Sequence, residues 1–151
     1  MFIDPKVIPE TSGTGYPDSF KSVVTGRYKK RLGNIAGLKN FGVNLVRLEP
    51  GSASSIRHWH AKQDEFIYVI EGEITLVTDK GEQILAPGNA AGFPAGETNG
   101  HHLINRSDRD AIYLEIGDRT PEDSVIYPDD DLRAVMGEKG WQFTHKNGEP
   151  Y

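Results

Sequence analysis

The chain has 151 residues, of which 36% are hydrophobic and 26% charged, and its formal net charge is −5. This size and composition predict a single folded, water-soluble domain and exclude a disordered chain. The sequence contains no cysteine, which excludes disulfides, thiolate metal sites and cysteine nucleophiles.

Residues 1–33 are predicted to form an N-terminal arm, because Pro and Gly are scattered through them without a hydrophobic period. The first residues lack the apolar core of a signal peptide, and no apolar run is long enough to span a membrane. We therefore expect a cytoplasmic protein with no membrane partner. A short basic cluster, Arg27, Lys29, Lys30 and Arg31, is interpreted as a solvated stretch of this arm. With the negative net charge, it predicts no nucleic-acid partner.

Residues 34–117 are predicted to form a series of short strands separated by turn signals such as Glu71-Gly72-Glu73 and Asp79-Lys80-Gly81. Short strands with no helical period between them indicate an all-β sandwich or barrel. The expected strands are Phe41–Leu48, Ile56–His60, Glu65–Ile70, Ile74–Thr78, Glu82–Leu85, His101–Asn105 and Ala111–Ile116.

Residues 118–151 are predicted to form a C-terminal tail that packs on the barrel. Leu132, Val135 and Met136 have helical spacing, acidic residues precede them and Gly137 follows, which predicts a short helix. The preceding run Asp129-Asp130-Asp131 is assigned to the acidic start of this helix. It lacks the alternating ligands and later Glu of a calcium loop.

Four of the five histidines occur in two pairs, His58 with His60 and His101 with His102. Residues two apart on a strand face the same side, so His58 and His60 can converge on one point. Glu65 begins the next predicted strand and lies near His60 if the two strands pair. Two imidazoles and a carboxylate suit Mn, Fe, Ni, Co or Zn as divalent ions.

The residues around the first pair resemble the first motif of the cupin family. That motif is a Gly, His-x-His, a Glu after three or four residues and a Gly after six more. Here it is matched by Gly51, His58, His60, Glu65 and Gly72. The interval from Gly51 to His58 is one residue longer than the usual five.

The second cupin motif is resembled by Gly88, Pro94-Ala95-Gly96, His101 and Asn105. Four residues rather than two separate Gly96 from the histidine, so either His101 or His102 could be the fourth ligand. The three-residue interval to Asn105 favours His101. The resemblance covers about residues 40–117 and contains one copy of the motif pair.

The resemblance implies a double-stranded β-helix, the jelly-roll barrel of cupins, with one divalent transition metal per chain. The implied ligands are His58, His60, Glu65 and His101, and the metal could be Fe, Mn, Zn, Ni or Co. Single-domain cupins of this kind are commonly homodimers with exchanged N-terminal strands, which would give residues 1–33 a role.

Two functions are compatible with such a site. One is a metal-dependent enzyme that oxygenates, decarboxylates or isomerises a small polar metabolite. The alternative is a non-catalytic module that binds or senses a small molecule. The sequence places no general acid or base in the pocket beyond the ligands, so it assigns no catalytic residue and leaves the substrate open.

Overall fold

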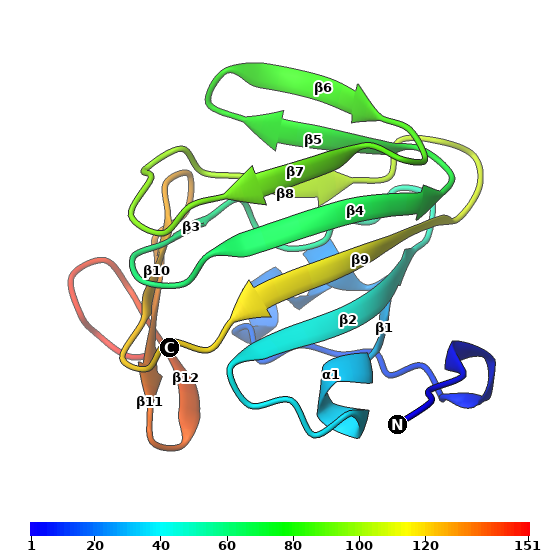
Figure 1. The fold of residues 1–151 in the computed structure, drawn as a ribbon. Helices are drawn as coiled ribbons and strands as arrows, with labels where there is room; N and C mark the ends of the chain where they lie inside the picture. The colour runs from blue at the N-terminus through cyan, green and yellow to red at the C-terminus, as the bar shows by residue number, and fades with distance from the viewer.

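Antiparallel strands dominate the fold, and the computed structural model describes all residues from 1 to 151 (Figure 1). Two sheets face each other as a jelly-roll barrel. The larger sheet has the order β1-β2-β9-β4-β7, formed by Arg27–Lys30, Phe41–Leu48, Ala111–Asp118, Glu65–Glu71 and Ala90–Phe93. The smaller has the order β6-β5-β8, formed by Gly81–Leu85, Ile74–Thr78 and His102–Ile104. This architecture confirms the predicted all-β cupin barrel.

A third sheet lies against one end of the barrel (Figure 1). Its order is β12-β11-β10-β3, formed by Gly140–Thr144, Leu132–Gly137, Ser124–Tyr127 and Trp59–His60. The helices are short: two 3₁₀ helices, Pro5–Val7 and Asp18–Val24, and α1, Leu32–Ile35. Since β10 pairs with β3, the C-terminal sheet is hydrogen-bonded to the strand that carries His60.

Alternation of side chains along the strands produces the barrel core. On β4, Ile67 and Val69 are buried, whereas the residues between and beside them point outward. The buried side chains from both sheets form one apolar cluster: Val46, Leu48, Ile67, Val69, Ile74, Leu85, Leu103, Ala111 and Tyr113. At the turn from β4 to β5, Gly72 has φ +74°, and an added Cβ would lie 2.6 Å from the Asp110 carbonyl oxygen. Only glycine fits there.

The strands predicted at Phe41–Leu48 and Ile74–Thr78 have the same bounds in the structure. The strand predicted at Ile56–His60 is reduced to the two residues of β3. The strand β7 was not predicted, because its Ala- and Gly-rich sequence lacks the apolar alternation that identifies a strand.

The helix predicted in the tail is wrong: Leu132–Gly137 is strand β11. Leu132 and Ala134 are buried while Arg133 and Val135 are exposed, which is the period of a strand. Strands β10 and β12 pair with β11 on its two sides, and these hydrogen bonds override the helical spacing of the apolar residues.

The interpretation of the basic cluster as solvated is wrong for two of its members. Arg27 to Lys30 form β1, which pairs with β2 along the barrel sheet. Arg27 and Lys29 are partly buried and line a cavity inside the barrel, whereas Lys30 hydrogen-bonds the Pro5 carbonyl oxygen outside it. Their spacing of two residues places both side chains on the inner face.

The outer face of β4 carries three partly exposed apolar side chains, Phe66, Tyr68 and Ile70. The predicted homodimer with exchanged N-terminal strands requires a second copy of the chain. The structure describes one copy, so the homodimer and the strand exchange stay predictions. The structure contains no helix with the length and hydropathy needed to cross a membrane.

Candidate metal centre

Backbone pairing brings the two histidine clusters together. His58 and His101 face each other as a hydrogen-bonded antiparallel pair, with N···O distances of 3.0 and 2.8 Å. His60 lies in β3, which pairs with β10, and Glu65 is the first residue of β4. Segments more than forty residues apart in the chain therefore meet at one end of the barrel.

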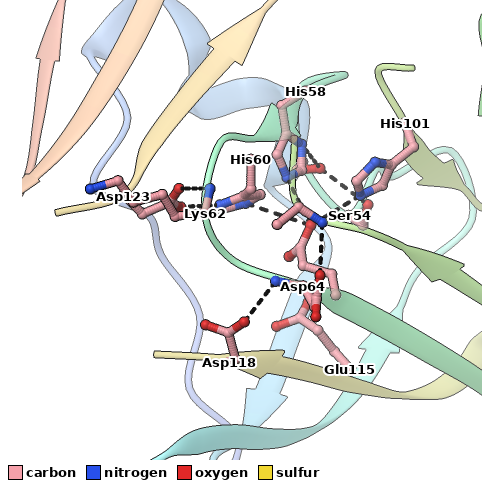
Figure 2. Close-up of polar contacts among 12 residues, drawn as sticks. Ser54, His58, His60, Lys62, Asp64, His101, Glu115, Asp118 and Asp123 are labelled. Atoms are coloured by element: carbon pink, nitrogen blue, oxygen red, sulfur yellow. Dashed lines mark hydrogen bonds and ion pairs between the residues drawn. The ribbon is translucent and has the colours of Figure 1, made fainter. Parts of the chain in front are cut away.

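The three imidazoles point their Nε2 atoms at one carboxylate oxygen (Figure 2). Glu65 Oε2 lies 3.0 Å from His101 Nε2, 3.4 Å from His58 Nε2 and 3.5 Å from His60 Nε2. Donor atoms of His58, His60 and Glu65 lie within 4.8 Å of one another. We refer to His58, His60, Glu65 and His101 as the histidine–glutamate cluster.

His102 lies outside this cluster. Its Nδ1 is 3.1 Å from the Ser55 carbonyl oxygen, and neighbouring residues of a strand face opposite sides of the sheet. Of the two candidates, His101 is therefore the one that the fold turns toward Glu65. Its ring stacks on Phe93 with 3.5 Å between ring centres, which holds the imidazole plane.

The opposite ring nitrogens of His58 and His60 have acceptors that orient both rings. His58 Nδ1 donates to the Ile56 carbonyl oxygen at 2.8 Å. His60 Nδ1 donates to Asp123 Oδ2 at 2.6 Å, and Asp123 also accepts the Lys62 N–H at 2.7 Å. A proton held on Nδ1 leaves the Nε2 lone pair free for a metal. No motif in the sequence pointed to Asp123, which is fully buried and 63 residues from His60.

Burial and the charge of neighbouring groups shift the pKa values of Glu65 and His58 in opposite directions. Burial by itself raises the pKa of Glu65, but the surrounding histidines outweigh it and hold that pKa well below its ordinary value. Burial lowers the pKa of His101 below its ordinary value. For His58, burial lowers the pKa, and the Glu65 carboxylate outweighs it and raises that pKa. The cluster thus contains an ionised carboxylate.

The donor set fits a divalent transition metal. Metal–nitrogen bonds of about 2.1 Å place neighbouring ligand atoms about 3.0 Å apart in an octahedron and about 3.4 Å apart in a tetrahedron. The three distances to Glu65 Oε2 lie within 0.1 Å of this range. Imidazole and carboxylate donors suit Zn, Fe, Mn, Co and Ni.

The cluster opens into a cavity of about 280 Å³ inside the barrel. Tyr16, Tyr127, Trp141 and Phe143 contribute aromatic walls from the N-terminal arm and the C-terminal sheet. Polar side chains line the cavity beyond the cluster: Arg27, Lys29, Ser54, Tyr113 and Glu115. The sequence motifs pointed to none of Lys29, Tyr113 and Glu115 as residues of the cavity.

Polar residues next to the ligand motifs brace the loops around the site. Gln63 Nε2 donates to the Thr120 carbonyl oxygen, and Asp64 accepts the Ala95 N–H at 2.7 Å. Asn105 is fully buried and donates to the carbonyl oxygens of Leu48 and Arg109. Asn105 therefore holds the turn before β9 rather than entering the cavity.

Asp123→Asn is expected to weaken metal binding about 10–100-fold, the usual effect of losing a partner that orients a histidine ligand. The amide removes the negative charge beside His60 Nδ1 while keeping the side-chain shape. Competition with a chromophoric chelator measures the affinity. Asp118→Asn is the matched control, since Asp118 accepts backbone N–H groups of Asp64 and Thr120 but contacts no histidine ring. Equal losses in both variants would contradict the orienting role of Asp123.

The family model described as "Cupin domain" matches residues 44–117. A sugar phosphate isomerase of the cupin superfamily from Silicibacter pomeroyi is 45% identical, with a TM-score of 0.96. The match covers 100% of this chain and 96% of that one. The chain belongs to the cupin superfamily.

Two further solved structures place this cupin among its relatives. A proposed sugar phosphate isomerase from Acidithiobacillus ferrooxidans is 30% identical over 83% of this chain and 80% of that one, with a TM-score of 0.75. The polyketide cyclase RemF from Streptomyces resistomycificus is 20% identical over 78% of each chain, with a TM-score of 0.65, and shares the fold. No curated protein sequence matches the chain.

Proposed function

We propose that this cupin holds one divalent transition metal through His58, His60, Glu65 and His101 and isomerises a small anionic sugar. The observation that carries the proposal is the convergence of three imidazole Nε2 atoms on Glu65 Oε2 inside the cavity. Four protein donors leave two positions on a six-coordinate ion. The metal would supply Lewis-acid polarisation of a carbonyl group.

The dimensions and charge of the cavity support a small anionic substrate. Its volume of about 280 Å³ lies just below the roughly 300–1,000 Å³ of most small-molecule sites. Arg27 lines it without a carboxylate partner, and its guanidinium donates to the Ser54 and Gly13 carbonyl oxygens. Five N–H donors belong to an arginine, so three remain for a phosphate or carboxylate group.

The relatives support isomerisation as the reaction class. The Silicibacter pomeroyi protein, described as a sugar phosphate isomerase, matches this chain over its full length at 45% identity. Isomerisation of an aldose to a ketose moves protons and needs no external oxidant. Among oxygenation, decarboxylation and isomerisation, the comparison therefore favours isomerisation.

The experiment is turnover of a panel of three- to six-carbon aldose and ketose phosphates by metal-loaded protein in D₂O, followed by ¹H and ³¹P NMR. We expect interconversion of at least one pair, with deuterium entering at the carbon next to the carbonyl. Chelator-treated protein and unphosphorylated sugars are the controls. A phosphorylated sugar that binds and is recovered unchanged would contradict the enzyme and favour the binding module.

Arg27→Met provides a second test of the anionic substrate. A hydrogen bond to a charged group contributes about 1.5–3 kcal/mol, so kcat/KM for the phosphorylated substrate should fall about 10–150-fold, mainly through KM. Arg109→Met is the matched control, because Arg109 is 78% exposed and lies outside the cavity. An unchanged KM in Arg27→Met would contradict the assignment of Arg27.

A further inference from the structure

We propose that Glu115 is the general base of this cupin and that Lys29 positions it. The inference rests on the proposed isomerisation and adds the residue that moves the carbon-bound proton. Glu115 lies on β9, on the same side of the sheet as the histidine–glutamate cluster (Figure 2). It is not one of the four proposed metal ligands, and its carboxylate lines the cavity where a substrate would bind.

Strand register places Glu115 within reach of a molecule held at the cluster. Glu65 on β4 pairs with Gly117 on β9, so Glu115 is its diagonal neighbour on the inner face. Such diagonal neighbours have Cα atoms about 7–8 Å apart. Both carboxylates therefore border the same cavity, so a sugar held at the histidine–glutamate cluster lies on the face of the sheet that carries Glu115.

The contacts of Glu115 hold its carboxylate but leave it free to accept a proton. Lys29 Nζ lies 2.7 Å from Oε1 and 2.9 Å from Oε2, and Asn44 Nδ2 donates to Oε1 at 2.9 Å. A carboxylate has about four acceptor positions, and these bonds occupy three, so one remains on Oε2. Lys29 likewise has a third N–H left for a substrate oxygen.

The carboxylate is in the basic form at neutral pH. Burial by itself raises the pKa of Glu115, but the adjacent Lys29 ammonium outweighs it, so that pKa lies below its ordinary value. Glu115 is thus an anion paired with a cation inside the cavity. This supplies the acid–base group that the sequence could not place.

Tyr113 places a further polar group beside Glu115 on the inner face of β9. It precedes Glu115 by two residues on β9, is fully buried and lines the cavity. Its hydroxyl has no hydrogen-bond partner in the protein. Because buried hydroxyls are nearly always paired, Tyr113 is a group that could hydrogen-bond a polar ligand held next to Glu115.

The proposed step conserves atoms and electrons. Glu115 takes the proton from the carbon next to the carbonyl, the C–H electron pair forms a C=C bond, and the carbonyl π pair moves to its oxygen. The resulting enediolate takes the proton back from Glu115 at the former carbonyl carbon. Transfer of the hydroxyl proton between the two oxygens, across the Lys29 ammonium, completes the isomer without oxidant or reductant.

The test compares Glu115→Gln with wild-type protein, both metal-loaded, on the sugar phosphates used above. General base catalysis contributes about 10²–10⁴-fold, so kcat and deuterium incorporation should fall by that factor. Metal content by mass spectrometry should remain at the wild-type level, since Glu115 is not a ligand. Glu73→Gln, an exposed glutamate in the turn after β4, is the matched control and should match wild type in all three readouts.

Two further results separate the possible failures. If Glu115→Gln is unstable, the Lys29→Met/Glu115→Gln double variant removes both charges together and should show the same loss of exchange. If wild-type protein turns over the substrate and the metal-loaded Glu115→Gln variant exchanges deuterium equally well, the inference is overturned. The proposed function then remains intact. Absence of turnover by metal-loaded wild-type protein across the panel would overturn the proposed function, and the inference with it.

Discussion

Glu65→Gln is expected to lower metal affinity by more than the roughly 10–100-fold that loss of an outer partner causes. The reason is geometric, because Glu65 Oε2 is the atom that all three imidazole Nε2 atoms face. The amide removes the only carboxylate within this group and leaves three uncharged nitrogen donors. Purified Glu65→Gln should therefore contain far less metal than wild-type protein by inductively coupled plasma mass spectrometry.

Thermal unfolding gives a second measurement of the same loss. A ligand at 100 times its dissociation constant stabilises the folded state by about 2.7 kcal/mol, so added Zn²⁺ or Mn²⁺ should raise the Tm of wild-type protein. It should leave the Tm of Glu65→Gln nearly unchanged. Glu73→Gln controls for a lost surface charge, since Glu73 is exposed and is not part of the histidine–glutamate cluster. Equal metal content and equal Tm shifts in all three proteins would contradict the site.

Leu132→Ala is expected to destabilise the protein by about 2–5 kcal/mol, the usual cost of a large cavity in a core. Leu132 is fully buried on β11, within a second apolar cluster that joins the N-terminal arm to the C-terminal sheet. The members of this cluster are Tyr16, Val24, Ile56, Val125, Tyr127, Leu132 and Ala134. Urea unfolding followed by tryptophan fluorescence measures the change in the free energy of unfolding.

Val135→Ala is the matched control for this substitution. Val135 lies three residues later on β11 and is 39% exposed, so its truncation should cost well under half as much. A helix over the same residues would place Leu132 and Val135 on one face, and the two substitutions would then cost similar amounts. Similar losses in both variants would contradict the strand.

Local pattern was sufficient for strands whose β-prone residues are followed by clear turn signals. Strands β2 and β5 are rich in apolar and β-branched residues and end at Pro-Gly or Asp-Lys-Gly turns, so their bounds could be predicted from these signals alone. β11 could not, since its apolar residues satisfy a helical and a strand spacing together. Only its pairing with β10 and β12 distinguishes the two.

The ligand hypothesis depended on motif spacing, which the sequence shows without the fold. His58 and His60 are two residues apart, and Glu65 and His101 stand at motif distances from them. The choice between His101 and His102 needed the fold, because a shift of one residue in a strand reverses the face of each side chain. The backbone pair between His58 and His101 decides that register.

The sequence by itself therefore determined the fold class and singled out the residues that we propose as metal ligands, because both follow from strand periodicity and motif spacing. The tertiary structure alone decided which charged groups share the cavity. Lys29 and Glu115 are 86 residues apart, and Asp123 lies 63 residues from His60. Strand pairing and burial bring such partners together. The residues next to a single lysine or aspartate in the sequence do not indicate which distant residue it will contact.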